Sequence, residues 1–229
     1  ICVMEASGPY YLKLATFLSE QAIDVCVINP FVIRRFSQMR MSRAKTDKKD
    51  AMLIAEYGKT ENPGIWEPEA NHVLELKQMQ AYLEQLNKNR TGFVVQKEAF
   101  NQNPIKSETL EKSINTVLET IEQEMKNIEK KMELIIKTHH QEMFSQLKSI
   151  PGMGTKTSLL LIVISGGFSK FNNHKQLASY VGISPRIFES GTSVKGRSKI
   201  CKMGMSKIRA MLYVCAWSAK KCNKSCKEL

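Results

Sequence analysis

Apolar positions follow two different spacings in the first part of this chain. Short continuous apolar runs at residues 1–6 and 23–28 predict buried β-strands. Around these runs, apolar residues recur three or four positions apart, as at Tyr11 and Leu14, which predicts helices. Strands that alternate with helices predict a parallel pairing of the strands, so we expect an α/β domain over residues 1–70.

A heptad repeat marks the second segment, which we expect to span residues 71–144. The repeat places an isoleucine every seven residues and a leucine or methionine between them, at Ile114, Leu118, Ile121, Met125, Ile128, Met132 and Ile135. This spacing predicts a long helix with an a/d seam, whose antiparallel partner would be a helix near residues 73–86. Two interpretations stay open: a coiled-coil spacer or dimerisation arm, or a plain helical hairpin that packs on its own domain.

The third segment, residues 145–229, is predicted to be mainly helical. It begins with a helix end, a turn that contains Gly152 and Gly154, and a second helix that carries Lys156. Glycines permit positive φ and a close approach of another backbone, and exposed amides before a helix bind anions. This order predicts a helix-hairpin-helix element that binds the phosphate backbone without reading base sequence. Further helices are expected near residues 173–181 and 205–220.

Charge is concentrated in this third segment. The chain has 229 residues and a net charge of +12, yet residues 1–70 carry 9 basic and 9 acidic side chains. Residues 145–229 carry 15 basic and 2 acidic side chains. Such an excess predicts a nucleic-acid partner, with a merely solubilising surface as the alternative. No apolar run approaches the roughly 20 residues of a membrane span, so no membrane partner is expected.

Three acidic residues in the first segment are candidates for a metal site. Asp47 and Asp50 lie three positions apart at the start of a predicted helix and therefore share one face. Glu5 ends the first predicted strand, where open α/β sheets place their sites. Carboxylates bind hard cations such as Mg²⁺, which can activate phosphodiester chemistry. The alternative is an ordinary solvated helix N-terminus, where acidic residues are common.

Ser190, in the stretch "FESGTSVKG", is a candidate nucleophile. A serine hydroxyl can attack phosphorus when cations stabilise the phosphate charge. Four basic residues follow it, namely Lys195, Arg197, Lys199 and Lys202. Ser193 is an equally plausible hydroxyl on this evidence, and an ordinary turn serine is the simpler interpretation.

Six stretches, in this order along the chain, resemble one protein family. They are "MEASGPYYLKLATFLSEQAIDVCVINP", "KTDKKDAMLIAEY", "IPGMGTKTSLLL", "QLASYVGISPR", "ESGTSVKG" and "CKMGMSKIRAMLYVCAWSA". The chain is similar to the DEDD-type transposases of bacterial insertion sequences, the IS one-ten family, which includes Piv-type DNA invertases. The resemblance covers nearly the whole chain.

The resemblance implies a fold and a set of roles. Residues 1–70 would form part of a RuvC-like (RNase H-like) domain, 71–144 a coiled-coil segment, and 145–229 a basic transposase domain. Glu5, Asp47 and Asp50 match three of four acidic residues that hold Mg²⁺ or Mn²⁺. Ser190 matches a serine that becomes joined to DNA, using the acidic site of a neighbouring subunit.

The same resemblance implies partners and a cellular location. Family members act as homo-oligomers, dimers or tetramers, on DNA and use a structured non-coding guide RNA. The implied location is the bacterial cytoplasm, in association with the nucleoid.

Two departures from the family shape what we expect of this chain. Its first residue is isoleucine inside a predicted strand, and the fourth acidic residue of the family has no counterpart. We therefore expect a fragment of a longer protein, truncated at its N-terminus, that is inactive in recombination by itself. The alternatives to a transposase are a metal-dependent RuvC-like nuclease or resolvase, and a non-catalytic nucleic-acid-binding remnant.

Overall fold

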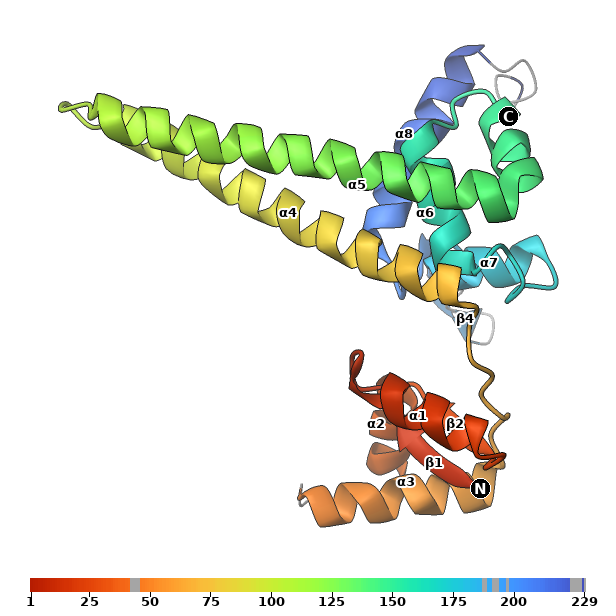
Figure 1. Ribbon diagram of the computed structural model, residues 1–229. Helices are drawn as coiled ribbons and strands as arrows, with labels where there is room; N and C mark the ends of the chain where they lie inside the picture. The colour runs from red at the N-terminus through yellow and green to blue at the C-terminus, as the bar shows by residue number, and fades with distance from the viewer. Residues whose placement is uncertain (42–45, 187–188, 191–193, 197, 223–227, 229) are drawn as a thin grey trace. The chain divides into compact units, whose positions relative to one another are not determined.

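The protein divides into two compact units, Ile1–Glu69 and Ala70–Leu229 (Figure 1). The computed structural model describes the chain except residues 42–45, 187–188, 191–193, 197, 223–227 and 229, and only the backbone of residues 189, 190, 194 and 195. Within the described part, no helix combines the length and the apolar character that crossing a membrane requires.

The first unit is a two-stranded parallel sheet with three helices. Its elements are β1 (Cys2–Glu5), α1 (Tyr10–Glu20), β2 (Val25–Ile28), α2 (Pro30–Met39) and α3 (Asp47–Glu61). The strands pair in register from Cys2 opposite Val25 to Glu5 opposite Ile28. The predicted parallel pairing is therefore confirmed, with α1 as the crossover between the strands.

Local chemistry explains where the helices α2 and α3 begin. The side chain of Asn29 accepts a hydrogen bond from the backbone N–H of Phe31 at 2.9 Å, and a proline occupies the first turn of α2. The hydroxyl of Thr46 accepts a hydrogen bond from the backbone N–H of Lys49 at 3.3 Å, which caps α3. Both caps satisfy amide groups that the first helical turn leaves without partners.

α3 lies against β1 and β2 through small and apolar residues. Cys26, Ile28 and Ile33 form a buried cluster, and Leu53 and Ile54 of α3 pack against it. Burial of the Cys26 thiol, with a further contribution from the charge of Asp24, raises its pKa. The unit therefore has its own core, which orients the start of α3.

The second unit begins with two long helices and continues with shorter elements. They are α4 (Asn71–Asn101), α5 (Glu108–Ser149), α6 (Thr155–Ser165), α7 (His174–Val181), β3 (Pro185–Arg186), β4 (Glu189–Ser190), β5 (Val194–Lys195), β6 (Lys199–Ile200) and α8 (Ser206–Cys222). The predicted helices near residues 173–181 and 205–220 are confirmed as α7 and α8. α7 ends where Gly182 adopts a left-handed conformation, with φ of 83°.

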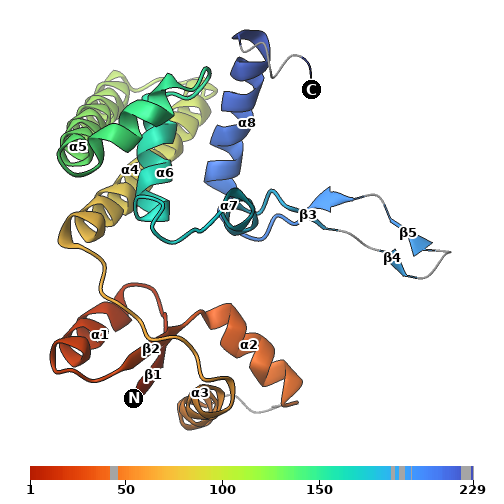
Figure 2. The ribbon, with the colours of Figure 1, turned by 90° about the vertical axis from the view of Figure 1, so that its right-hand side faces the viewer.

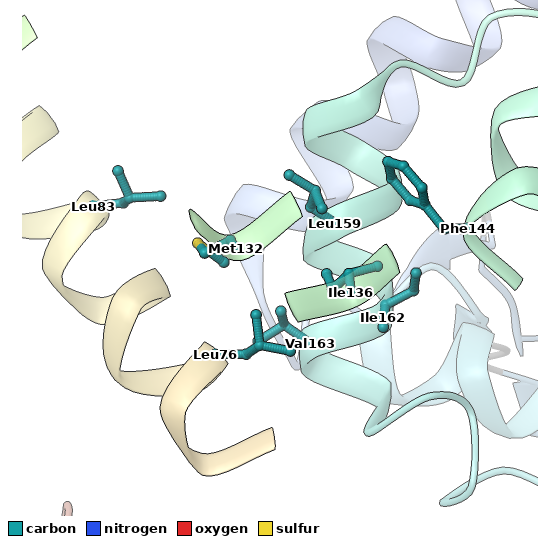
Figure 3. Packing of buried hydrophobic residues seen from close by; sticks show 8 residues of the cluster. All are labelled: Leu76, Leu83, Met132, Ile136, Phe144, Leu159, Ile162 and Val163. Carbon is teal, nitrogen blue, oxygen red and sulfur yellow. The ribbon is translucent and has the colours of Figure 1, made fainter. Parts of the chain in front are cut away.

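α4 and α5 form a hairpin that packs against α6 (Figures 1 and 3). Leu76 of α4, Met132 of α5 and Ile162 of α6 belong to one buried cluster. Ile136 lies outside the predicted heptad seam and is 0% exposed, because α6 packs at this level of the hairpin. The predicted pairing of the two helices within one chain is confirmed, and a coiled coil with a second chain stays a prediction.

α6 is covered on all sides, so it lacks the polar face of a surface helix. Every residue from Thr157 to Ser165 is buried. A second cluster, which includes Leu161, Val181 and Ile208, joins α6 to α7 and α8. The segments expected at residues 71–144 and 145–229 thus share a core in one compact unit, and their division into two domains stays a prediction.

Candidate catalytic and nucleic-acid-binding residues

The three acidic candidates lie toward the same end of the first unit. β1 ends at Glu5, α3 starts with Asp47 and Asp50 in its first turn, and α3 runs back against the direction of β1 (Figure 1). The two elements touch at Gly58, where an added Cβ would lie 2.5 Å from Cγ2 of Val3. Asp50 precedes Gly58 on α3 by about 12 Å, at roughly 1.5 Å per residue. Glu5 follows Val3 on β1 by about 7 Å, at roughly 3.3 Å per residue. Because the two elements run in opposite directions, both displacements point the same way.

The chemistry of these side chains suits a hard cation, although they do not form one cluster. Glu5 and Asp50 are half-buried and Asp47 is exposed. Among the described residues, none of the three carboxylates has an ion-pair partner, and no three His, Cys, Asp or Glu side chains gather in a group that could hold a metal. Carboxylate oxygens suit Mg²⁺ or Mn²⁺ in kind. The metal assignment stays a prediction.

The turn between α5 and α6 uses its two glycines differently. Gly152 has a φ of 91°, and an added Cβ would lie 2.5 Å from the carbonyl oxygen of Cys215 and 2.8 Å from the amide nitrogen of Ala219. Gly154 has a φ of −87°, with no atom within 4 Å of an added Cβ. The predicted positive φ and close backbone approach are therefore found at Gly152 alone, and the backbone that approaches it belongs to α8.

Lys156, predicted to contact phosphate, forms an ion pair within the second unit. Its Nζ lies 2.6 Å from Oε1 of Glu129 on α5. Lys207, at the start of α8, similarly lies 3.2 Å from Oε1 of Glu84 on α4. Burial acts to raise the pKa of Glu84, but hydrogen bonds from Gln80 and Lys207 outweigh it and the pKa is lowered. Both lysines are thus partly neutralised by acidic residues of the hairpin.

Ser190 ends β4, the first of two short strands that pair antiparallel, β4 and β5 (Figure 2). In this β4–β5 ladder Ser190 is opposite Val194, and Glu189 is opposite Lys195. The backbone therefore places Lys195 one position along the ladder from Ser190. The structure describes neither side chain, so the catalytic role of Ser190 stays a prediction.

The remaining basic candidates lie on other segments. Lys199 is exposed in β6, where it pairs with Arg186 of β3. Lys202 is exposed, has a φ of 56°, and donates its backbone N–H to the carbonyl of Gly182 at 3.1 Å. Arg197 lies outside the described residues. The backbone thus brings Lys195 close to Ser190 and places Lys199 on a separate ladder.

Sequence reasoning missed a cluster of three histidines in the second unit. The Nε2 atoms of His72 and His140 are 3.2 Å apart, and the ring of His139 stacks on His72 at a centroid distance of 4.0 Å. His72 precedes His140 by 68 positions, and no spacing rule connects residues so far apart. Only the adjacent pair His139–His140 was visible as a signal in the sequence.

Comparison with known proteins relates both units to IS110-type transposases. Residues 145–229 match the family described as "Transposase IS116/IS110/IS902 family", and residues 1–100 match an IS110 DEDD family described as "Transposase". The chain is 34% identical, over 224 residues and 93% of its length, to a "Pilin gene-inverting protein" of Moraxella lacunata and to one of Moraxella bovis. It spans 65% of the length of each of these relatives.

A third relative comes from an insertion element. The chain is 30% identical to an "Insertion element IS110 uncharacterized 43.6 kDa protein" of Streptomyces coelicolor over 84 residues, which are 37% of this chain and 20% of that protein. The two family matches, over residues 1–100 and residues 145–229, fall in both compact units. The chain therefore belongs to the IS116/IS110/IS902 family of transposases.

Proposed function

We propose that this protein is a DNA recombinase of the transposase and invertase type, which cuts DNA strands and rejoins them in a new order. The observation that carries the proposal is the 34% identity to gene-inverting proteins along 93% of the chain, across both compact units. A gene inverter must break and reseal phosphodiester bonds without losing their energy. Acidic residues in one unit and a serine among basic residues in the other suit that requirement.

In this proposal Glu5, Asp47 and Asp50 contribute to a site for Mg²⁺ or Mn²⁺. The bound cation would supply positive charge to the phosphate and lower the pKa of the attacking hydroxyl. The three carboxylates would bind and orient it, and the Thr46 cap would hold Asp47 and Asp50 at the start of α3.

Ser190 is the proposed nucleophile. Its Oγ would attack a DNA phosphorus, forming an Oγ–P bond while the bond from phosphorus to one bridging sugar oxygen breaks. The serine proton would leave to a base, and the released sugar oxygen would gain a proton. Attack by a second sugar hydroxyl would reverse these steps and regenerate the serine. Lys195, one position along the strand ladder, is well placed along the backbone to bind the phosphate.

The basic third of the chain would hold nucleic acid. Residues 145–229 carry 15 basic and 2 acidic side chains, and Lys199 and Lys202 are exposed. Contacts of this kind bind phosphates and weaken as salt rises. We include in the proposal a structured guide RNA that selects the DNA, a homo-oligomer in which one subunit's acidic site serves another's serine, and action in the bacterial cytoplasm.

The test uses protein expressed from the complete gene, with Mg²⁺, the RNA encoded beside the gene, and end-labelled DNA. Wild type, Ser190→Ala and the matched variant Ser193→Ala are incubated, denatured and separated on a gel. We expect label attached to protein in wild type and in Ser193→Ala, and none in Ser190→Ala.

Other outcomes would point to the competing functions. Equal DNA cleavage by all three proteins without any adduct would indicate a metal-dependent nuclease or resolvase in which the serine is structural. Salt-sensitive DNA binding with neither cleavage nor an adduct, with or without Mg²⁺, would indicate a binding protein only. Loss of the adduct in Ser193→Ala but not in Ser190→Ala would move the nucleophile to Ser193.

A further inference from the structure

Three histidine rings meet where the first turn of α4 lies against α5. The Nε2 atoms of His72 and His140 are 3.2 Å apart, with the ring planes tilted by 52°. His139 stacks on His72, with the two ring planes nearly parallel at 6°. None of these residues belongs to the acidic site or to the basic segment described above. The cluster therefore needs an explanation of its own.

The backbone holds the ring of His140 in place. His140 has φ of −140° and ψ of 34°, which interrupts α5 and turns this side chain out of the regular helical course. The ring lies against Gly167, where an added Cβ would be 2.8 Å from Cε1 and 3.1 Å from Nδ1. The loop after α6 thus packs on the Nδ1 side of the ring and leaves Nε2 directed at His72.

Burial and neighbouring charge act on the pKa values of two of the rings. Burial, followed by the charge of His139, lowers the pKa of His72. Burial, followed by the charges of His72 and His139, lowers the pKa of His140. A lowered pKa favours the neutral imidazole, the form in which a ring nitrogen has a lone pair to donate.

We propose that His72 and His140 form a binding site for a borderline transition-metal ion, Zn²⁺. Zinc binds imidazole nitrogen at about 2.0–2.1 Å, so two nitrogens 3.2 Å apart can share one ion at an N–Zn–N angle of about 100°. This angle is close to tetrahedral, and each ring would turn so that its Nε2 lone pair faces the ion. Whichever ring donates the hydrogen bond moves its proton from Nε2 to Nδ1, so no net charge is lost.

His139 does not take part in the site. A metal lies in the plane of the imidazole that binds it, and the planes of His139 and His72 are parallel and stacked. This agrees with the absence, among the described residues, of any group of three metal-binding side chains. Water would complete the coordination, because the described residues supply no third protein ligand beside the pair. The bound ion would link the start of α4 to the interruption in α5.

The cluster supplies its own control variant for the test. Metal-free protein is titrated with ZnCl₂ at pH 7.5 by calorimetry and by thermal unfolding, with MgCl₂ in parallel. We expect one zinc per chain in wild type and in His139→Gln, and affinity at least tenfold weaker in His72→Gln and in His140→Gln. Zinc at about 100 times its dissociation constant should raise Tm by roughly 5–10 °C. Mg²⁺ should have no effect on the cluster, because it prefers oxygen ligands.

Several results would overturn the proposal. Equal losses in His139→Gln and His72→Gln would show a different set of ligands. Zinc binding that survives in His72→Gln and His140→Gln would place the ion elsewhere, for example on cysteine thiolates. Absence of saturable zinc binding in wild type would leave the pair as a hydrogen bond only. If His140→Gln does not fold, judged by circular dichroism, His72→Gln decides the question, because His72 lies in the first turn of α4.

Discussion

Replacement of Gly152 by alanine tests how the turn before α6 is built. The new Cβ would lie 2.5 Å from the carbonyl oxygen of Cys215 and 2.8 Å from the amide nitrogen of Ala219, both backbone atoms of α8. The residue would also keep a φ of 91°, which costs a non-glycine residue about 1–2 kcal/mol. Displacing a packed backbone costs typically about 1–3 kcal/mol more. We expect a total destabilisation of roughly 2–5 kcal/mol.

The matched control is Gly154→Ala in the same turn. Gly154 has a φ of −87° and nothing within 4 Å of an added Cβ, so we expect a change within about 0.5 kcal/mol. Thermal unfolding of the two variants measures the difference. At about 2–4 °C per kcal/mol for a unit of this size, Gly152→Ala should lower Tm by roughly 4–20 °C.

One result would refute this reasoning, and a second readout extends it. If the two variants melt within about 2 °C of each other, the close approach of α8 is not the reason that stability requires a glycine at position 152. DNA binding measured on the folded variants then separates the roles. A phosphate-binding hairpin predicts that both variants lose affinity, whereas a purely structural role for Gly152 predicts no loss in Gly154→Ala.

Three further predictions concern the core, pH and charge. Ile136→Ala should cost about 2–5 kcal/mol in urea unfolding, because Ile136 is 0% exposed, while Ile105→Ala, at 84% exposure, should be nearly neutral. The lowered pKa values of His72 and His140 mean that the unfolded state binds more protons below about pH 6.5, so stability should fall as pH falls from 7 to 5. His72→Gln should flatten this pH dependence, and an unchanged slope would contradict the assignment. Lys156→Gln should change stability by under about 1 kcal/mol, because the Lys156 side chain is 69% exposed and solvent screens its charge, and a larger loss would show that the pair is structural.

Local patterns in the sequence predicted most of the elements of this protein. Apolar runs located β1 and β2, and the helical spacing that begins at Tyr11 located α1. The heptad spacing located α5 and its pairing with α4, since helices of this kind bury one stripe at a regular interval. The charge asymmetry predicted a nucleic-acid partner, because net charge is a property of composition alone.

The arrangement of distant residues depended on tertiary packing. Ile136 is buried because α6 covers it, although the heptad assigns it to neither a nor d. Lys156 pairs with Glu129 because α6 packs against α5. Gly152 lies in contact with α8 because of the way α8 packs beside the turn. The sequence does not contain either arrangement. The pairing of His72 with His140 depends on the break in α5 and on the loop at Gly167. Periodicity reports which face of a segment is buried, whereas only packing decides which distant segments share that burial.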